Sequence, residues 1–337
     1  MVVGQPIKLH SRVNTLNTQT LQQRIVRYGE LIPCRTAFID THTPGSDQKE
    51  NFTIIGAGVS ESPDQHVHIH ETPGFNIGAA GQPPKCTNSL HTHRTAEVFF
   101  VHKGTWRFFW GIDGTDGEFI AKEGDLFNIP TGIFRGFENV GEEYGMIMAV
   151  LGGDNAGGGV IWAPHVIKTA EQHGLILAET GRLYDSKKGE KLPNGIKPMP
   201  LLTLEELAQF PVLSEKEVIP HYVARYLDIK ATGNKEIVQV LGAQGMLKDR
   251  PGFEIDFLQA GQAGLGESYT SNQHEIFMVH EGHWKITVDN ETAILAPGDT
   301  CAVPPNTTRS IKPNVSGVTG LFLVRSTDDD AGYTQSV

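Results

Sequence analysis

The chain has 337 residues, which suits two ordinary domains better than one small barrel. Its formal net charge of -11 at pH 7 and its pI near 5.7 argue against a general binder of nucleic acid or of anionic membranes. The three cysteines, Cys34, Cys86 and Cys301, are far apart and form no CxxC pair, which favours a reducing compartment over a disulfide-stabilised fold. The N-terminus shows no basic region before a long apolar run, and no stretch reaches the length of a membrane span. We therefore expect a cytoplasmic protein.

The first 59 residues are expected to form an N-terminal arm. Its pattern predicts a helix near Leu16 to Tyr28, followed by strands over residues 34–40 and 52–55. The arm would lead into the first of the two larger units.

Three alternating histidines follow in His66-Val-His68-Ile-His70. Because side chains alternate along a strand, all three imidazoles would lie on one face. One of them could supply an additional metal ligand, whereas a solvated strand face is the plainer interpretation.

A more informative stretch is His91-Thr-His93-Arg-Thr-Ala-Glu97. Two histidines one residue apart on a strand point to the same face, and Glu97 lies at an even spacing from them, so it points there too. Two imidazoles and one carboxylate, with open positions left over, are the ligand set of non-haem Fe(II) oxygenases. The pattern predicts one divalent metal at His91, His93 and Glu97, Fe(II) first and Mn, Ni or Zn as alternatives. The competing interpretation is a pocket that these polar residues line without a metal.

The residues after Glu97 predict a hairpin. An apolar run ends at Gly104, and Trp106 to Trp110 would form the return strand. Alternation predicts that several apolar side chains line the interior of a barrel: Phe99, Val101, Phe108, Phe127, Ile129 and Met148.

Residues 153–220 differ in character from the segments on either side. His165 to His173 reads as a short helix stopped by Gly174, and Thr203 is placed to cap another helix. We expect a structured connector with short helices.

The two larger segments repeat one another. An offset of 178 positions places Glu97 on Glu275 and Trp106 on Trp284 without a gap, and after a hairpin shortened by four residues Arg135 falls on Arg309. Agreement at so many spaced positions indicates two copies of one β-unit.

The second copy has lost the ligand set. Tyr269 and Ser271 stand where His91 and His93 stand in the first copy, and Glu275 alone keeps a ligand-type side chain. We predict that the second unit binds no metal and serves stability or assembly.

The spacing also carries a resemblance. HxH, three residues, Glu, six residues and Gly resembles the first cupin motif, and Gly124 to Asn139 is similar to the second, with Pro130 and Gly132 in place. The usual final ligand histidine is Arg135 here. The resemblance implies an all-β fold of two cupin units, jelly-roll β-barrels related by the internal repeat, with a helical N-terminal arm and connector. The boundaries expected are listed here: 1–59 N-terminal arm, 60–152 metal-competent cupin unit, 153–220 connector, 221–337 cupin unit without ligands.

Arg135 leaves two interpretations open. Its guanidinium could clamp an acidic substrate, or it could pair with Glu97 in place of a metal. The chain resembles gentisate and quercetin dioxygenase-like two-cupin proteins, which implies an Fe(II) dioxygenase acting on a small aromatic, enolic or acidic substrate in the first barrel. Arg135 and Glu97 would be its catalytic residues. A non-catalytic small-anion-binding protein and a non-redox metal lyase or isomerase are the alternatives. The resemblance also implies a homo-oligomer.

Overall fold

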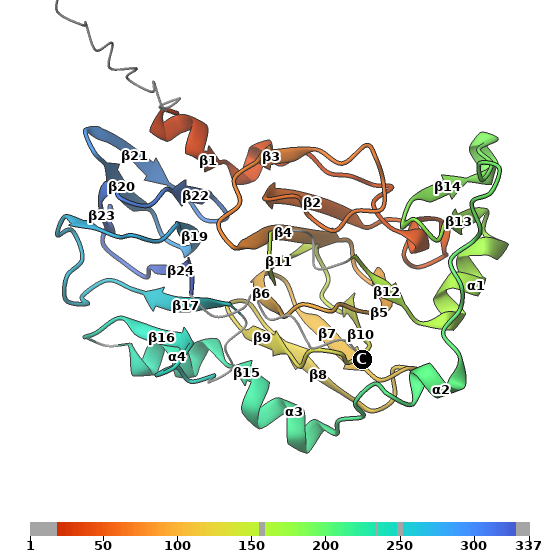
Figure 1. Cartoon of the computed structure of the whole chain (residues 1–337). Helices are drawn as coiled ribbons and strands as arrows, with labels where there is room; N and C mark the ends of the chain where they lie inside the picture. Colours follow the sequence, from red (N-terminus) through yellow and green to blue (C-terminus); the bar gives the residue numbers. More distant parts are fainter. Residues whose placement is uncertain (1–18, 155–158, 234, 248–251, 328–337) are drawn as a thin grey trace, which may run out of the picture.

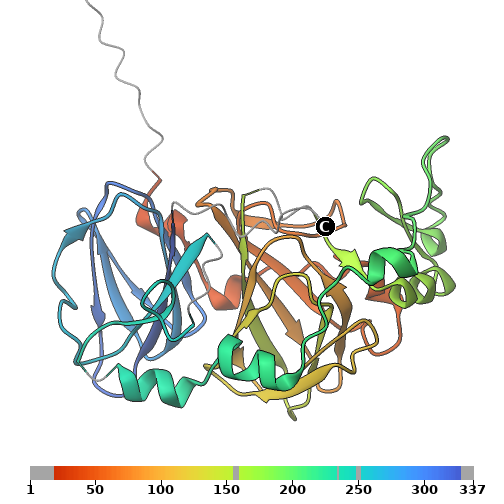
Figure 2. The same ribbon diagram turned by 60° about the horizontal axis from the view of Figure 1, so that its bottom comes forward.

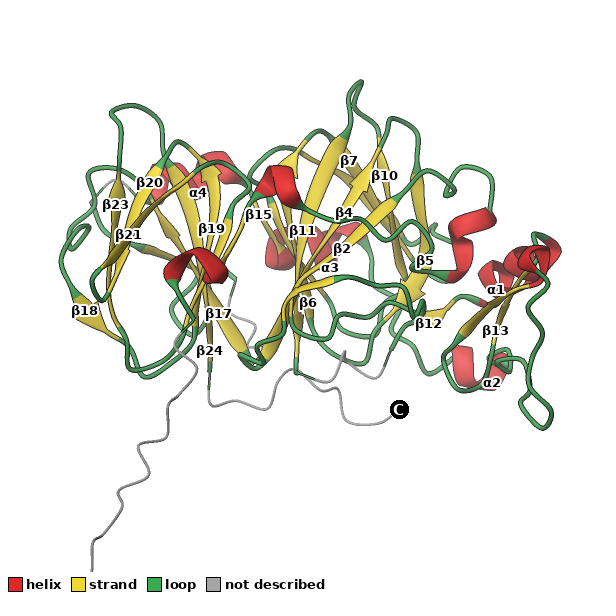
Figure 3. Ribbon diagram, turned by 90° about the horizontal axis from the view of Figure 1, so that it is seen from above, coloured by secondary structure: helices red, strands yellow, loops and turns green. Residues whose placement is uncertain are grey.

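The structure is a computed structural model that describes residues 19–154, 159–233, 235–247 and 252–327. Two β-barrels lie side by side, and a small region of helices and a hairpin extends from the far side of the first barrel (Figures 1 and 3). The fold is all-β and consists of two repeated barrel units, as the sequence predicts. In the described part of the chain, no helix is long and apolar enough to cross a membrane.

The first barrel consists of a seven-stranded sheet of order β15-β9-β6-β11-β4-β2-β3 and a five-stranded sheet of order β12-β5-β10-β7-β8. Its strands have the following bounds: β2 (Glu50–Ile55), β3 (Val67–Ile69), β4 (Phe75–Gln82), β5 (Thr87–Thr92), β6 (Glu97–Lys103), β7 (Trp106–Trp110), β8 (Gly117–Ala121), β9 (Leu126–Ile129), β10 (Arg135–Asn139), β11 (Gly145–Gly152), β12 (Ile161–Trp162) and β15 (Val223–Ala224). The hairpin predicted after Glu97 is confirmed as β6 and β7.

The second barrel consists of a six-stranded sheet of order β1-β22-β19-β24-β17-β16 and a four-stranded sheet of order β18-β23-β20-β21. Its strands have the following bounds: β1 (Ile25–Val26), β16 (Val238–Leu241), β17 (Phe253–Leu258), β18 (Tyr269–Thr270), β19 (Glu275–Glu281), β20 (Trp284–Val288), β21 (Glu291–Leu295), β22 (Thr300–Val303), β23 (Thr308–Pro313) and β24 (Gly320–Ser326). The repeat found in the sequence is a structural repeat, because β19 and β20 start at the positions that match the starts of β6 and β7.

Each barrel includes one short strand that comes from the chain segment preceding the other barrel in the sequence. β1 pairs with β22 of the second barrel, and β15 pairs with β9 of the first. The residues after the two strands make the same contacts: Arg27 and the backbone of Tyr28 bind Asp299, as Arg225 and the residue after it bind Asp125. The segment expected as an N-terminal arm therefore contributes strands to both barrels.

Two local predictions in this arm are wrong. In place of one helix near Leu16 to Tyr28, 3-10 helices at Leu21–Arg24 and Tyr28–Glu30 flank β1, while residues 16–18 lie outside the described part. The edge of the second barrel offers hydrogen bonds that outweigh local helix propensity here. Residues 34–40 form no continuous strand: Cys34 makes an isolated bridge, and the 3-10 helix Ile39–His42 follows. The strand predicted at residues 52–55 is confirmed within β2.

The connector is structured and contains the predicted helices. Its elements have these bounds: α1 (Pro164–Gln172), β13 (Leu175–Leu177), β14 (Leu183–Asp185), a 3-10 helix (Ser186–Lys188), α2 (Leu204–Leu207), α3 (Glu215–Tyr222) and α4 (Tyr226–Thr232). Thr203 caps α2 in a capping box with Glu206. The stretch from α2 to α4 runs along one side of both barrels (Figure 2).

The apolar core has separate parts. Phe99, Phe108 and Phe127 belong to the interior of the first barrel, together with Val101 and Ile129. Met148, predicted to line that interior, packs instead in the core between the barrels, because its position on β11 faces the other side of the sheet.

Candidate metal site

The structure brings His91, His93 and Glu97 together. His91 lies near the end of β5, His93 directly after it, and Glu97 begins β6. One possible ligand atom from each residue lies within 4.8 Å of the others, and all three side chains are buried. The three residues converge as predicted, but not through alternation along one strand: residues 93–96 form a turn between β5 and β6, so Glu97 comes from a second strand.

Backbone carbonyls orient both imidazoles. His91 donates from Nδ1 to the Ser89 carbonyl at 2.7 Å, and His93 donates from Nδ1 to the Gly159 carbonyl at 3.0 Å. Each bond leaves Nε2 with its lone pair free, as a metal ligand requires. His93 Nε2 lies 3.9 Å from Glu97 Oε2.

Burial keeps these histidines neutral. Desolvation, followed by the nearby charge of Arg135, lowers the pKa of His91 well below its ordinary value and that of His93 to about 4. Neutral imidazole is the form that binds a cation, so the arrangement fits a divalent metal with three protein ligands.

Arg135 makes the contact that the second interpretation predicts. Its Nη2 pairs with Glu97 Oε2, and its Nη1 donates to the His91 carbonyl at 3.0 Å. The side chain is 2% exposed and is not among the described residues that line the adjoining cavity. This geometry favours a pair with Glu97 over a direct clamp on substrate.

A cavity of about 80 Å³ adjoins the three residues inside the first barrel. Its floor is made of small side chains on two neighbouring strands, Gly78 and Ala80 on β4 and Ala149 on β11. Among the described residues of the lining, Glu97 is the only acidic one, and none is a lysine or arginine. The cavity is therefore mainly apolar, with polar groups at a few places.

A buried ion pair behind His91 was missed by sequence reasoning. Lys49 pairs with Asp40 and donates to Asn88 Oδ1 at 2.9 Å. The Asn88 amide nitrogen lies 3.3 Å from His91 Nδ1. Lys49 stands in a polar segment of the sequence where nothing distinguishes it from a surface lysine, although it is only 2% exposed.

Trp162 packs against the same histidine from the other side. Its ring centroid lies 5.3 Å from that of His91, and its Nε1 donates to Glu61 Oε1 at 2.7 Å. Burial raises the pKa of Glu61 to about 8 despite this hydrogen bond. Sequence reasoning also missed Glu61 and Trp162, because their hydrogen bond joins residues 101 positions apart, at the start of the first unit and in the connector.

The alternating histidines do not join the site. In the described residues, the donor group consists of His91, His93 and Glu97 alone. His68 contacts the backbone with both ring nitrogens, the Ile32 amide at 3.1 Å and the Thr53 carbonyl at 2.7 Å, while His66 and His70 are exposed.

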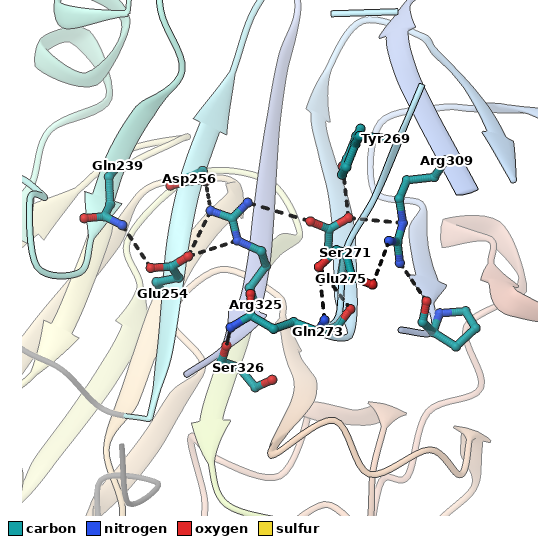
Figure 4. Close-up of polar contacts among 11 residues, drawn as sticks. Gln239, Glu254, Asp256, Tyr269, Ser271, Gln273, Glu275, Arg309, Arg325 and Ser326 are labelled. Atoms are coloured by element: carbon teal, nitrogen blue, oxygen red, sulfur yellow. Dashed lines mark hydrogen bonds and ion pairs between the residues drawn. The ribbon is translucent and has the colours of Figure 1, made fainter. Parts of the chain in front are cut away.

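The equivalent place in the second barrel holds a network of charges (Figure 4). The Tyr269 hydroxyl donates to Glu275 Oε2 at 2.9 Å, Arg309 Nε lies 3.3 Å from the same oxygen, and Arg325 Nη1 lies 3.7 Å from Oε1. Arg325 also pairs with Asp256. The two oxygens of Glu275 thus face a hydroxyl and two guanidinium groups.

The repeat-related His102 and His280 take no part in the candidate ligand group. Their rings lie 5.8 Å apart between the barrels, with Phe100 against both. Both histidines pack against aromatic side chains between the barrels and lie in the interior of neither barrel.

Comparison with known proteins supports the fold. The cupin domain family matches residues 80–151 and 257–323, one segment in each barrel. The oxalate decarboxylase of Lactobacillus farciminis, solved as a formate complex, is similar at 14% identity and a TM-score of 0.53, covering 91% of this chain and 87% of that chain.

Further similar structures point to more than one kind of protein. A deletion mutant of Bacillus subtilis oxalate decarboxylase has 15% identity and a TM-score of 0.51, covering 90% of this chain and 77% of its own. Vicilin from hazelnut, Corylus avellana, has 12% identity and a TM-score of 0.52, covering 92% and 86%. No curated protein matches the sequence. The two domain matches and the repeated barrels show that this chain belongs to the cupin superfamily as a two-domain member.

Proposed function

We propose that the protein is a metal-dependent oxidoreductase, with Fe(II) as its first-choice metal, that acts on a small acidic or enolic substrate in the first barrel. The observation that carries the proposal is the buried group of His91, His93 and Glu97 beside a cavity. Two imidazoles and one carboxylate with open positions are the ligand set of Fe(II) oxygenases.

The charge of the site supports an anionic substrate. Arg135 neutralises Glu97, and the cavity lining holds no other charged carboxylate. A bound dication would therefore leave an uncompensated positive charge in an apolar cavity, where an anion is strongly stabilised. A carboxylate or an enolate would supply the missing charge.

The volume of the cavity supports a small substrate. At roughly 10–15 Å³ for each water-sized position, the cavity of about 80 Å³ accepts a molecule the size of a small carboxylic acid. A multi-ring flavonol is too large. This size favours small acidic, enolic or single-ring substrates over a multi-ring flavonol among those implied by the resemblance.

Each residue would have a distinct task. His91 and His93 would hold the metal through Nε2, and Glu97 would complete the set through Oε1. Arg135 would hold Glu97 in place and donate no proton, because a guanidinium stays charged at ordinary pH. Phe99 and Phe137 would keep bulk water away from the substrate. The metal would supply a Lewis-acidic and redox-active centre.

The test is to identify the metal in the purified protein and to measure oxygen consumption with a panel of small carboxylic and enolic acids. We expect iron, and oxygen uptake with at least one acid that is lost after chelation. A metal-free protein that binds an acid without turnover would support the small-anion-binding alternative. Turnover without oxygen and with a redox-inert metal would support a lyase or isomerase.

The assembly state belongs to the same proposal. Two-cupin proteins commonly pair or form rings, so we expect a homo-oligomer. Sedimentation analysis tests this expectation, and a monomer at all concentrations would contradict it.

A further inference from the structure

An unpaired amide lies in the lining of the cavity. Asn51 on β2 is 8% exposed, and its side-chain nitrogen is buried without a hydrogen-bond partner. The residue is also part of the cavity wall. A buried donor without a partner costs about 1–3 kcal/mol, so its position calls for an explanation.

The strand order places Asn51 far from the metal ligands. From β6, which carries Glu97, the sheet continues through β11 and β4 to β2. That is three strand spacings of about 4.8 Å each. Thr53 shares the inner face of β2 with Asn51 and also lines the cavity.

Small side chains line the part of the cavity between Asn51 and the metal ligands and leave it open. Thr53 is paired with Gly78, and Gly78 is paired with Ala149, which lies beside Phe99 on β6. Asn51 is paired with Ala80. A ligand can lie along this floor with one end at His91, His93 and Glu97 and the other end at the amide.

Two other amides of the lining already have hydrogen-bond partners. Asn76 accepts from the Gly58 amide at 3.0 Å and donates to the Gly153 carbonyl at 2.6 Å. Asn88 accepts from Lys49. Among the described residues of the lining, Asn51 is the one whose amide nitrogen is buried without a partner, and a ligand could supply that partner.

We infer that Asn51 anchors the far end of the substrate, through a hydrogen bond to an uncharged oxygen. This inference rests on the proposed function, which places the acidic end of the substrate at the metal. In the described part of the lining there is no lysine or arginine, so a second carboxylate at the far end would be buried without a counter-charge there. The substrate class is a small acid that carries a carbonyl or hydroxyl oxygen at its other end.

Three probe acids of similar length distinguish this substrate class. Pentanoate has no acceptor at its far end, levulinate adds a keto oxygen, and succinate has a second carboxylate. Titration calorimetry of the metal-loaded protein would give the three dissociation constants. We expect levulinate to bind about tenfold more tightly than pentanoate, as one well-placed hydrogen bond allows, and succinate to bind more weakly than levulinate.

The matched variants are Asn51→Leu and Gln82→Leu. Gln82 is also a buried amide whose side-chain nitrogen and oxygen lack partners, but it does not line the cavity. Asn51→Leu should abolish the preference for levulinate and should not lower the melting temperature, because it removes an unpaired buried donor. Gln82→Leu should keep the preference. If the leucine variant does not fold, the preference for levulinate can be measured in Asn51→Ala instead.

The outcomes separate this inference from the proposed function. A protein that holds its metal but binds levulinate no better than pentanoate, or keeps that preference in both Asn51 variants, overturns the role of Asn51 alone. A protein that holds no metal and binds none of the three acids overturns both.

Discussion

Across β4 and β11, the inner positions of the first barrel carry Gly78 and Ala149, whereas the matching positions of the second barrel carry Asp256 and Leu323. Leu151 is likewise replaced by Arg325, which reaches Glu275. The first barrel therefore keeps a cavity beside its acidic residue, and the second surrounds the acidic residue with charged and apolar side chains. A shared strand framework thus does not determine whether the interior holds a ligand; a few inward side chains do.

The arginines at the common position test this difference most strongly. Arg135→Met leaves the buried Glu97 without its guanidinium, which typically costs about 3–5 kcal/mol. Arg309→Met should cost less, because Glu275 keeps Arg325 nearby. Both variants should unfold at lower denaturant than the parent. Added divalent metal should restore stability to Arg135→Met, because a cation can replace the arginine beside Glu97, but not to Arg309→Met.

Denaturant titration with and without metal measures both effects. Equal rescue of the two variants would mean that the barrels do not differ in metal binding. If metal does not rescue Arg135→Met, the donor set is not a metal site.

A larger side chain that fills the cavity of the first barrel, as Leu323 fills the matching space in the second, should abolish ligand binding. Ala149→Leu introduces the side chain that the second barrel carries as Leu323 and should cost about 1–3 kcal/mol through overpacking. Affinity for the probe acids should fall beyond detection, while metal content stays the same. Calorimetry of the same sample that is used for metal analysis checks this. Unchanged acid binding would place the substrate elsewhere.

Glu61 offers a pH test that concerns only the first barrel. Its pKa is raised from 4.5 to about 8, so the folded state holds a proton that the unfolded state releases above pH 4.5. The resulting stabilisation is complete at low pH and is lost as pH rises through about 8, with a total of at most a few kcal/mol. Relative to Glu61→Gln, the parent should therefore lose stability between about pH 5 and pH 8. Parallel curves for the two proteins would contradict the raised pKa.

The sequence was informative where chemistry is local. The HxH…Glu spacing predicted that His91, His93 and Glu97 converge, and the repeat predicted two barrels. The assumption of one continuous strand was wrong, because a turn at residues 93–96 separates β5 from β6. Lys49 and Asn51 could not be found in this way, because their burial depends on which strands meet them in the fold. The strands β1 and β15 could not be predicted from the sequence for the same reason. Each is two residues long and forms only by pairing with a barrel strand far away in the sequence.

The most direct measurement is the metal content of three proteins: the parent, the double variant His91→Ala with His93→Ala, and Glu275→Gln. The first barrel is predicted to hold all the metal through its two histidines. The parent and Glu275→Gln should therefore contain about one metal ion per chain, and the histidine variant should contain essentially none while keeping its circular dichroism spectrum. Metal retained in the histidine variant, or lost in Glu275→Gln, would contradict the assignment of the metal to the first barrel.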